Sequence, residues 1–371
     1  MSLETPAFNL PAKDLEESLA VILRASGCAL DIASEVAAAL VDSDQCGHGR
    51  HGSRQIDFYV ERLRRGDVDG MARPAIVSET ANLLRVAGNR AFGQIAGAYA
   101  ARVGAACAAR HGVSIVCLSN SGHLGRNGRW PEIAADMGIG SLHFGQGIAA
   151  PGQVAPHGGR EGRLNTNPVA LGLPGSGHAD SIILDFATSS VSGSAIKQAH
   201  DRGAPLEGPF LVAQDGSFTN DPAAFIAGEA AATTFGGFKG FGISIFSEIV
   251  STILAPAGDA QPATNSLFSV YFALDRLIDI GRYRDLVSAY RDRVVGCPPM
   301  PGVEAVVMPG DRARRTRERT EQLGVQVTSD MSHHIRRAAK RVGVLDRVVA
   351  RVPGIAIANT GAANSEPEAF R

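Results

Sequence analysis

The sequence lacks an excess of charge of either sign, because 36 lysine and arginine residues are balanced by 37 aspartate and glutamate residues. A chain so close to neutrality gives no global electrostatic reason to bind nucleic acid or an anionic membrane surface. The arginine-rich segment 311–351 contains no aromatic residue that could stack on bases. We therefore expect neither a nucleic-acid nor a membrane partner.

Cysteines are few and scattered, and long apolar runs are missing. The five cysteines form no framework spacing, which favours a reducing compartment over a disulfide-stabilised fold. The first residues, MSLETPAF, do not join a basic region to an apolar block, and the longest apolar stretch, residues 243–255, contains Glu248. These absences predict a cytoplasmic protein without a membrane-spanning segment.

The sequence does contain enough apolar material for a large core, since 44% of the residues are hydrophobic and 20% are charged. A chain of 371 residues suits two packed lobes better than one minimal domain. Helical periodicity predicts helices at residues 14–26, 31–44, 53–65, about 91–110, 243–254, 283–294, 313–323 and 332–342. Short apolar runs predict strands at 83–87, 113–118, 141–144, 168–173, 181–186, 268–272 and 305–308, and Asp215-Gly216 predicts a hairpin.

The strongest candidate for proton chemistry is His51, in the glycine-rich loop CGHGRHG of residues 46–52. It directly precedes the helix that Ser53 would cap, and a helix N-terminus offers free N–H groups to a carboxylate. Histidine exchanges protons near neutral pH. Two other readings stay open: a plain surface histidine, or a metal ligand together with Cys46 and His48, although the sequence supplies no further ligand at zinc spacing.

Two further candidates follow predicted strands. His123 lies in the loop SNSGHLGRNG after a buried strand, where glycines allow a ligand to approach the backbone. Asp185 ends another strand, and its carboxylate could orient a histidine or bind a ribose hydroxyl. The alternatives are a structural turn for His123 and a helix N-cap for Asp185.

Lys239 lies in the turn GGFKGFG just before a predicted helix, which suits a phosphate. The turn does not match the phosphate-binding loop of nucleotide triphosphatases, and no G-x-G-x-x-G follows a first strand. By motif alone, a Rossmann domain is therefore not supported.

The order of these motifs resembles the type-2 malate/L-lactate dehydrogenase family, which is distinct from the Rossmann-fold lactate and malate dehydrogenases. The likeness covers about residues 10–345 and is carried by GHGRHG with YVERLRRG, NSGHLGRNG, APHGGREGRLNTNPVA, ILDFATS, GGFKGFG and MPGDR. The family includes ureidoglycolate dehydrogenase, sulfolactate dehydrogenase, diketogulonate reductase and piperideine-2-carboxylate reductase. It implies a non-Rossmann α/β fold, with a helical N-terminal lobe plus a cofactor domain with a mostly antiparallel sheet.

The resemblance also implies roles for single residues. His51 matches the family's proton donor, and His123 matches a second histidine that is catalytic in some members, with Asp185 beside the reacting centre. The segment along the nicotinamide cofactor matches Asp185, Phe186, Ala187, Thr188, Ser189, Ser190 and Val191. Further cofactor contacts match Phe238 and Lys239, and then Gly310, Asp311 and Arg312.

Three positions depart from the family pattern. Arg50 stands where serine is usual, Gln55 stands where arginine is usual, with Arg54 one place earlier, and Phe238 stands where histidine is common. The candidate substrate ligands are Arg50, Arg54 and Thr166. The added positive charge points to a substrate that carries extra negative charge.

Taken with the resemblance, the sequence predicts an NAD- or NADP-dependent oxidoreductase that interconverts a small 2-hydroxy acid and its 2-oxo acid, without a metal and as a homodimer. Residues 1–118 with 313–371 are expected to form the helical substrate and dimerisation lobe, and residues 119–312 the cofactor-binding domain. The first alternative is NADPH-dependent reduction of a cyclic imino acid in the same frame. The second is a metal-dependent hydrolase that uses the cysteine and histidines of the CGHGRHG loop.

Overall fold

The computed structural model describes residues 8–147, 152–177, 180–254 and 265–357. The chain divides into two compact units: the first is Met1–Arg64 with Thr316–Arg371, and the second is Arg65–Arg315. None of the helices in the described ranges is long and apolar enough to cross a membrane.

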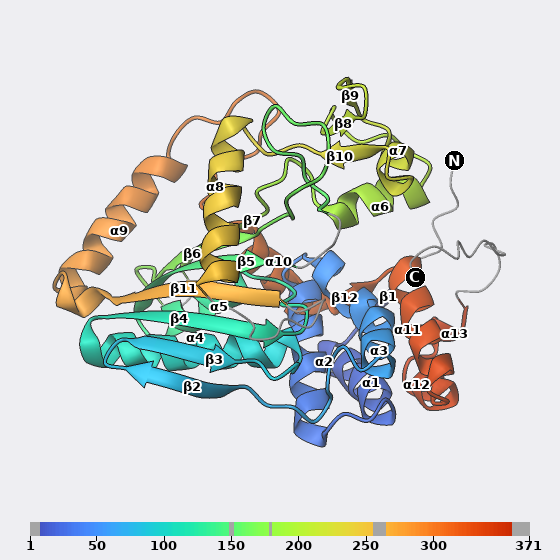
Figure 1. Cartoon of the computed structure of the whole chain (residues 1–371). Helices are drawn as coiled ribbons and strands as arrows, with labels where there is room; N and C mark the ends of the chain where they lie inside the picture. The colour runs from blue at the N-terminus through green and yellow to red at the C-terminus, as the bar shows by residue number, and fades with distance from the viewer. Residues whose placement is uncertain (1–7, 148–151, 178–179, 255–264, 358–371) are drawn as a thin grey trace. The chain divides into compact units, whose positions relative to one another are not determined.

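The first unit is built mainly of amphipathic helices. In α1, the buried residues Leu15, Leu19, Ile22 and Leu23 repeat at helical spacing and form one apolar face. A short antiparallel pair of strands, β1 and β12, joins the two ends of the unit. The elements are β1 (Phe8–Leu10), α1 (Ala12–Ala25), α2 (Leu30–Gln45), the short 3-10 helices η1 (Gly49–His51) and η2 (Ser53–Gln55), α3 (Ile56–Arg64), β12 (Val325–Val327), α11 (Ser329–Arg341), α12 (Leu345–Arg351) and α13 (Gly354–Ile357) (Figure 1).

A seven-stranded sheet organises the second unit, with strand order β2-β3-β4-β11-β5-β6-β7. Among the described strands, the pairing of β3 with β4 is parallel and the other pairings in this sheet are antiparallel. This arrangement differs from the parallel sheet of a Rossmann fold. The strands are β2 (Ala75–Thr80), β3 (Leu83–Ala87), β4 (Val113–Ser121), β11 (Asn265–Ala273), β5 (Ile139–Gln146), β6 (Val169–Leu173) and β7 (Ile182–Phe186).

Small residues of α4 (Gly93–His111) allow close packing of the core on one face of this sheet. A side chain at Gly97 would collide with the ring of buried Trp130, and one at Gly104 would collide with the ring of buried Tyr271. The alanine-rich helix therefore lies directly against the sheet, together with α5 (Arg129–Asp136).

The opposite face of the sheet carries α8 (Phe238–Glu248), which continues as the π-helix η3 (Ile249–Ile253) (Figure 1). Contact with the sheet includes an edge-to-face ring pair between Phe144 and Phe246. A smaller three-stranded sheet has its own apolar cluster. The other elements are α6 (Gly193–Asp201), β8 (Leu211–Ala213), β9 (Phe218–Thr219), α7 (Pro222–Ile226), β10 (Ala230–Ala232), η4 (Leu274–Arg276), α9 (Ile280–Val295) and α10 (Asp311–Leu323), which continues into the first unit.

Most predicted elements are confirmed, and the antiparallel sheet is confirmed as well. The predicted strand at 305–308 is wrong: in the described chain this segment has no strand, and Pro309 contributes one backbone bond, from Ile183 N to its carbonyl (3.2 Å). The helix expected from residue 53 begins as η2 and becomes α-helical at Ile56. Residues 65–118, expected in the helical lobe, belong to the second unit because β3 and β4 are strands of its large sheet.

Candidate active site

In the first unit, the central feature is the histidine loop, residues 46–53, which carries His51. The chain turns tightly here, since His48 N donates to the Ser43 carbonyl (2.8 Å) and His51 N donates to the His48 carbonyl (2.8 Å). Gln55 Nε2 donates to the Arg50 carbonyl (2.6 Å) from the following turn. The half-buried His51 thus sits on a hydrogen-bonded backbone rather than on a loose loop.

A buried carboxyl group lies against this loop. Asp44, in the last turn of α2, is only 8% exposed and accepts hydrogen bonds at Oδ2 from Ser53 N (2.9 Å) and from the Ser53 hydroxyl. Burial raises the pKa of Asp44 to about 7, and the two bonds from Ser53 oppose that rise. Gly52 leaves no room for a side chain, because a Cβ atom there would overlap the carboxyl group of Asp44.

The two candidate arginines next to His51 differ in their surroundings. Arg54 is largely buried and its Nε pairs with Asp330 Oδ2 of α11 at 3.1 Å. Arg50 is exposed. The pKa of Asp330 is held below its usual range by a hydrogen bond from His334 and by the charges of Arg54, His334 and His333. Arg54 is thereby fixed by an ionised partner.

The cysteine and histidines of this loop do not form a metal-ligand set. Across the described ranges, no group of three His, Cys, Asp or Glu side chains is arranged to hold a metal ion. The sulfur of Cys46 instead accepts a hydrogen bond from Arg317 Nη2 at 2.9 Å, and Arg317 also binds Asp42 (2.6 Å).

In the second unit, Asp185 joins β7 to the loop that carries His123. Its Oδ2 accepts a hydrogen bond from Gly128 N at 2.7 Å. Burial raises the pKa of Asp185, while the bond from Gly128 and the charge of Arg126 oppose the rise. Arg126 is itself held by Glu132 through a bidentate pair of 2.7 and 2.6 Å. The carboxylate therefore fixes the position of the loop after β4.

The predicted cofactor segment after Asp185 pairs with the chain just before α8. Ser190 N donates to the Thr233 carbonyl (2.8 Å) and Phe235 N donates to the Thr188 carbonyl (3.1 Å). Thr188 also donates, through its N–H (2.8 Å) and its hydroxyl (3.0 Å), to the carbonyl of Thr166. Three stretches that lie far apart in the sequence thus meet at the end of β7.

Lys239 lies in the first turn of α8, because the helix begins at Phe238 and not at residue 243 as predicted. Gly236 and Gly237 precede it at φ values of 56° and 62°, which favour glycine and turn the chain sharply into the helix. The ring of His157 lies beside Phe238, with ring centres 6.3 Å apart. The structure therefore brings together the APHGG and GGFKG motifs.

The third predicted cofactor segment, Gly310 to Arg312, lies beside β7. Internal ion pairs engage part of it. Gly310, at φ 96°, packs against the backbone of Ile183. Asp311 is buried and binds Arg291 (2.7 Å) and Arg314 (2.9 Å). Although burial would raise its pKa, the hydrogen bonds and the charges of both arginines hold the pKa of Asp311 below its usual range. Arg312 is exposed.

One end of the large sheet carries buried oxygen atoms that have no hydrogen-bond partner within the described part of the chain. We call it the polar sheet end; the atoms are Asn120 Oδ1, Gln146 Oε1, Asn167 Oδ1 and Ser266 Oγ. Gln146 of β5 and Ser266 of β11 lie opposite each other in the sheet. The N–H of Gly145 donates to the Pro168 carbonyl (2.9 Å). Buried polar atoms normally have partners, so this surface fits a polar ligand such as a carboxamide or ribose of a nicotinamide cofactor.

The comparisons with known proteins agree with this arrangement. A model of the malate/L-lactate dehydrogenase family matches residues 10–336. This chain belongs to that family. The L-lactate dehydrogenase of Cupriavidus necator is 33% identical, over 78% of this chain and 85% of its own length.

A reductase and a further dehydrogenase are also similar to this chain. The Δ1-pyrroline-2-carboxylate/Δ1-piperideine-2-carboxylate reductase of Pseudomonas putida is 30% identical, over 86% of this chain and 93% of its own length. The crystal structure of a dehydrogenase from Sinorhizobium meliloti superposes with a TM-score of 0.78 and is 26% identical, covering 90% of this chain and 98% of its own.

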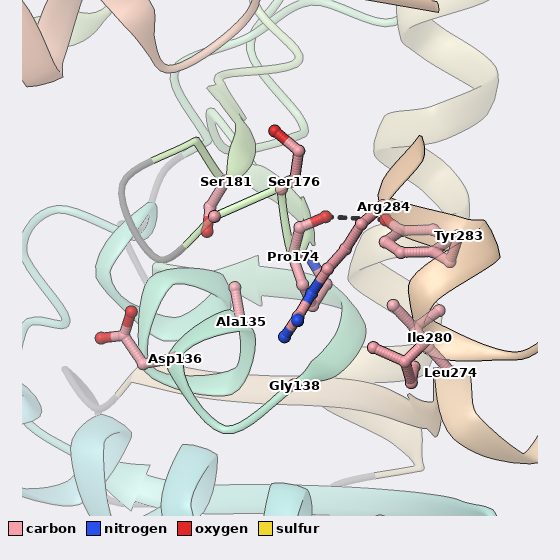
Figure 2. Close-up of a pocket in the computed structure, with 12 residues that line it drawn as sticks. Ala135, Asp136, Gly138, Pro174, Ser176, Ser181, Leu274, Ile280, Tyr283 and Arg284 are labelled. Carbon is pink, nitrogen blue, oxygen red and sulfur yellow. Dashed lines mark hydrogen bonds between the residues drawn. The ribbon is translucent and has the colours of Figure 1, made fainter. Parts of the chain in front are cut away.

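A separate cavity of about 220 Å³ lies at the other end of strands β5 to β7. Its walls come from the end of α5, the turn between β6 and β7, and the start of α9 (Figure 2). The Tyr283 hydroxyl donates to the Pro174 carbonyl (2.7 Å), and the side chain of Arg284 extends into the space. No predicted site residue is among the described residues that line it, so this cavity is separate from the candidate active site.

Some residues of this family member's site were not predicted from the sequence. Asp44 is the clearest case, and its signal was a carboxylate in the last turn of an amphipathic helix, where the helix dipole disfavours a negative charge. Asn167, which follows the candidate residue Thr166, has a positive φ of 34° and was given no role. His157 gave no signal beyond the glycines that follow it.

Proposed function

We propose that this chain interconverts a small 2-hydroxy acid and its 2-oxo acid, with NAD or NADP as the redox partner and His51 as the acid–base group. Membership of the malate/L-lactate dehydrogenase family supports the reaction class. The observation that carries the proposal is the histidine loop, in which a half-buried imidazole stands on a backbone fixed by hydrogen bonds. A positioned histidine is the usual group for proton transfer near neutral pH.

The cofactor, when bound, supplies a nicotinamide ring that accepts or gives hydride. In the oxidative direction, His51 takes the hydroxyl proton of the acid, and in the reductive direction it returns that proton to the carbonyl oxygen. Arg50 and Arg54 hold the carboxylate, and Asp185 keeps the His123 loop in place through Gly128. Thr166 would contact the substrate, and the segment from Asp185 to Val191, with Phe238, Lys239 and the Gly310 turn, would hold the cofactor.

A panel of 2-hydroxy acids tests this proposal. Purified protein is incubated with L-lactate, L-malate or L-sulfolactate and with NAD or NADP, and the reduced nicotinamide is followed by its absorbance. We expect turnover of at least one acid, with one cofactor preferred. The absence of turnover with every pair, in both directions, would reject the proposed reaction.

Reduction of a cyclic imino acid is the second candidate, because the Pseudomonas putida relative at 30% identity is named for that activity. The same residues can serve it, since His51 can donate a proton to a ring nitrogen as well as to a carbonyl oxygen. The discriminating assay uses Δ1-piperideine-2-carboxylate with NADPH. Reduction of this imine without activity on pyruvate or oxaloacetate would favour the second candidate.

We also propose that the protein is a cytoplasmic homodimer. The continuous helix α8–η3 and the residue after it expose large apolar side chains, with Phe246 at 52%, Ile253 at 68% and Leu254 at 54%. Exposed apolar rows of this kind favour association with another chain. Light scattering coupled to gel filtration should give twice the mass of one chain, and cell fractionation tests the compartment.

A further inference from the structure

We infer that Asp44 is the positioning residue of the histidine loop: its carboxyl group holds the chain directly after His51 and thereby fixes the imidazole. The inference rests on the proposed acid–base role of His51. It concerns the first unit alone, because every contact that carries it lies between α2 and residues 49–53.

Asp44 contacts the residues that directly follow His51 in the sequence and lies close to those before it. After His51, Oδ2 accepts both the N–H and the hydroxyl of Ser53, and the carboxyl group fills the space that a side chain at Gly52 would need. Before His51, Oδ1 lies 3.6 Å from the place where a Cβ of Gly49 would stand. The backbone directly after His51 is therefore packed on this carboxyl group, and the residues before His51 lie close to it.

The location of this carboxyl group is unfavourable for stability. Burial without a cation disfavours a carboxylate, and so does the negative end of a helix dipole, where the last turn of α2 places it. Within the described residues, Oδ1 accepts no hydrogen bond. A residue with these costs is expected where geometry matters more than stability, as at active sites.

The first test needs neither substrate nor cofactor. Histidines of the full chain are labelled with carbon-13, and the ring signal of His51 is identified by its loss in His51→Ala. We expect Asp44→Ala to shift or broaden this signal, while Asp44→Asn, which keeps an oxygen acceptor for Ser53, leaves it close to wild type. An unchanged signal in a folded Asp44→Ala protein would overturn the inference.

The second test measures turnover with the acid and cofactor selected by the panel. Asp44→Ala should lower kcat about a hundredfold, because a displacement of about 1 Å at a reacting group costs that much. KM for the acid should stay within about threefold, since Asp44 is buried and acts on the acid only through His51. Asp44→Asn should restore most of kcat. The matched control is Ser43→Ala, a buried hydroxyl in the same turn that bonds only to the Ala39 carbonyl (2.9 Å).

A double-mutant cycle separates positioning from a merely structural effect. If Asp44 acts through His51, the Asp44→Ala/His51→Ala protein should turn over as slowly as His51→Ala and no more slowly. If the two substitutions lower kcat by factors that multiply in the double variant, the inference is contradicted. If Asp44→Ala does not fold, Ser53→Ala takes its place in the ring-signal test and in the cycle, with an expected loss in kcat of about tenfold.

The two proposals fail in different ways. Retained turnover in His51→Ala removes the proposed acid–base role, while the ring signal still decides whether Asp44 fixes the loop. Full loss in His51→Ala together with an unmoved signal and normal kcat in folded Asp44→Ala rejects only the inference on Asp44.

Discussion

Two histidine environments, one in the large sheet and one in the histidine loop, show how the surroundings decide what an imidazole can do. His143 is fully buried in β5, and its two ring nitrogens are engaged by the hydroxyls of Ser269 and Ser141, each at 2.9 Å. Burial lowers the pKa of His143 to about 3, so this ring stays neutral at physiological pH. His51 is half-buried on the hydrogen-bonded histidine loop, where we propose that it meets the substrate. Only the second environment suits proton exchange.

The largest expected effect comes from removing the exchanging ring. His51→Ala should lower kcat about a thousandfold, which is typical of a lost general acid–base group, with cofactor binding unchanged. The measurement combines steady-state kinetics with titration of NADH fluorescence. His111→Ala is the control, because His111 is exposed at the end of α4 and should leave kcat as it is. If kcat of His51→Ala equals that of His111→Ala, the His51 ring takes no part in proton exchange.

Overfilling the space under the histidine loop should come next. Gly52→Ala places a methyl group on the Asp44 carboxyl group, and overpacking of this kind costs about 3 kcal/mol of the free energy of unfolding. Chemical denaturation measures the loss. Gly242→Ala is the control, because its Cβ would meet no atom within 4 Å and alanine favours the helix. A Gly52→Ala protein as stable as wild type would show that the loop is not packed as described.

Disturbing the buried ring in the sheet should affect stability but not turnover. His143→Leu leaves the hydroxyls of Ser141 and Ser269 without their partner, which costs about 2 kcal/mol of the free energy of unfolding. Because its pKa is depressed, His143 stabilises the fold above pH 6.5 and loses this contribution as the pH falls toward about 3. The variant should therefore be less acid-sensitive in thermal unfolding. A marked loss in kcat would contradict a structural role.

The pH dependence of Asp44 should have the opposite sign. Its pKa is raised to about 7 in the folded protein, so its contribution to stability is present at acidic pH and is lost as the pH rises through 7. Asp44→Asn cannot ionise, and its stability relative to wild type should increase by about 2 kcal/mol between pH 5 and pH 8. Thermal unfolding at both pH values measures this difference. A constant difference would mean that Asp44 titrates as an ordinary carboxylate.

Local patterns predicted much of this molecule and failed where distant segments meet. The strand at residues 83–87 was predicted at its exact bounds, because β-branched and apolar residues there are flanked by turn residues. The false strand at 305–308 has similar composition. In the described chain, however, the backbone bond to β7 here is made by the next residue, Pro309, whose carbonyl accepts from Ile183 N. Pairing partners cannot be seen in a single local pattern.

The candidate site divides in the same way. His51, Asp185 and Lys239 could be proposed from the sequence because each stands near an element boundary that local signals mark. Asp44 was missed because its partner, Ser53, is reached only after the loop folds back onto α2. The pairing of residues 188–190 with 233–235 was likewise beyond local reasoning, since it depends on the tertiary fold.

Transfer of an isotope label tests the central claim most directly. The acid selected by the panel is prepared with deuterium at C2 and oxidised by the protein, and the reduced cofactor is isolated and examined by proton NMR and mass spectrometry. Hydride transfer predicts one deuterium at C4 of the nicotinamide and none in the solvent. Oxidised acid with an unlabelled cofactor would contradict the account.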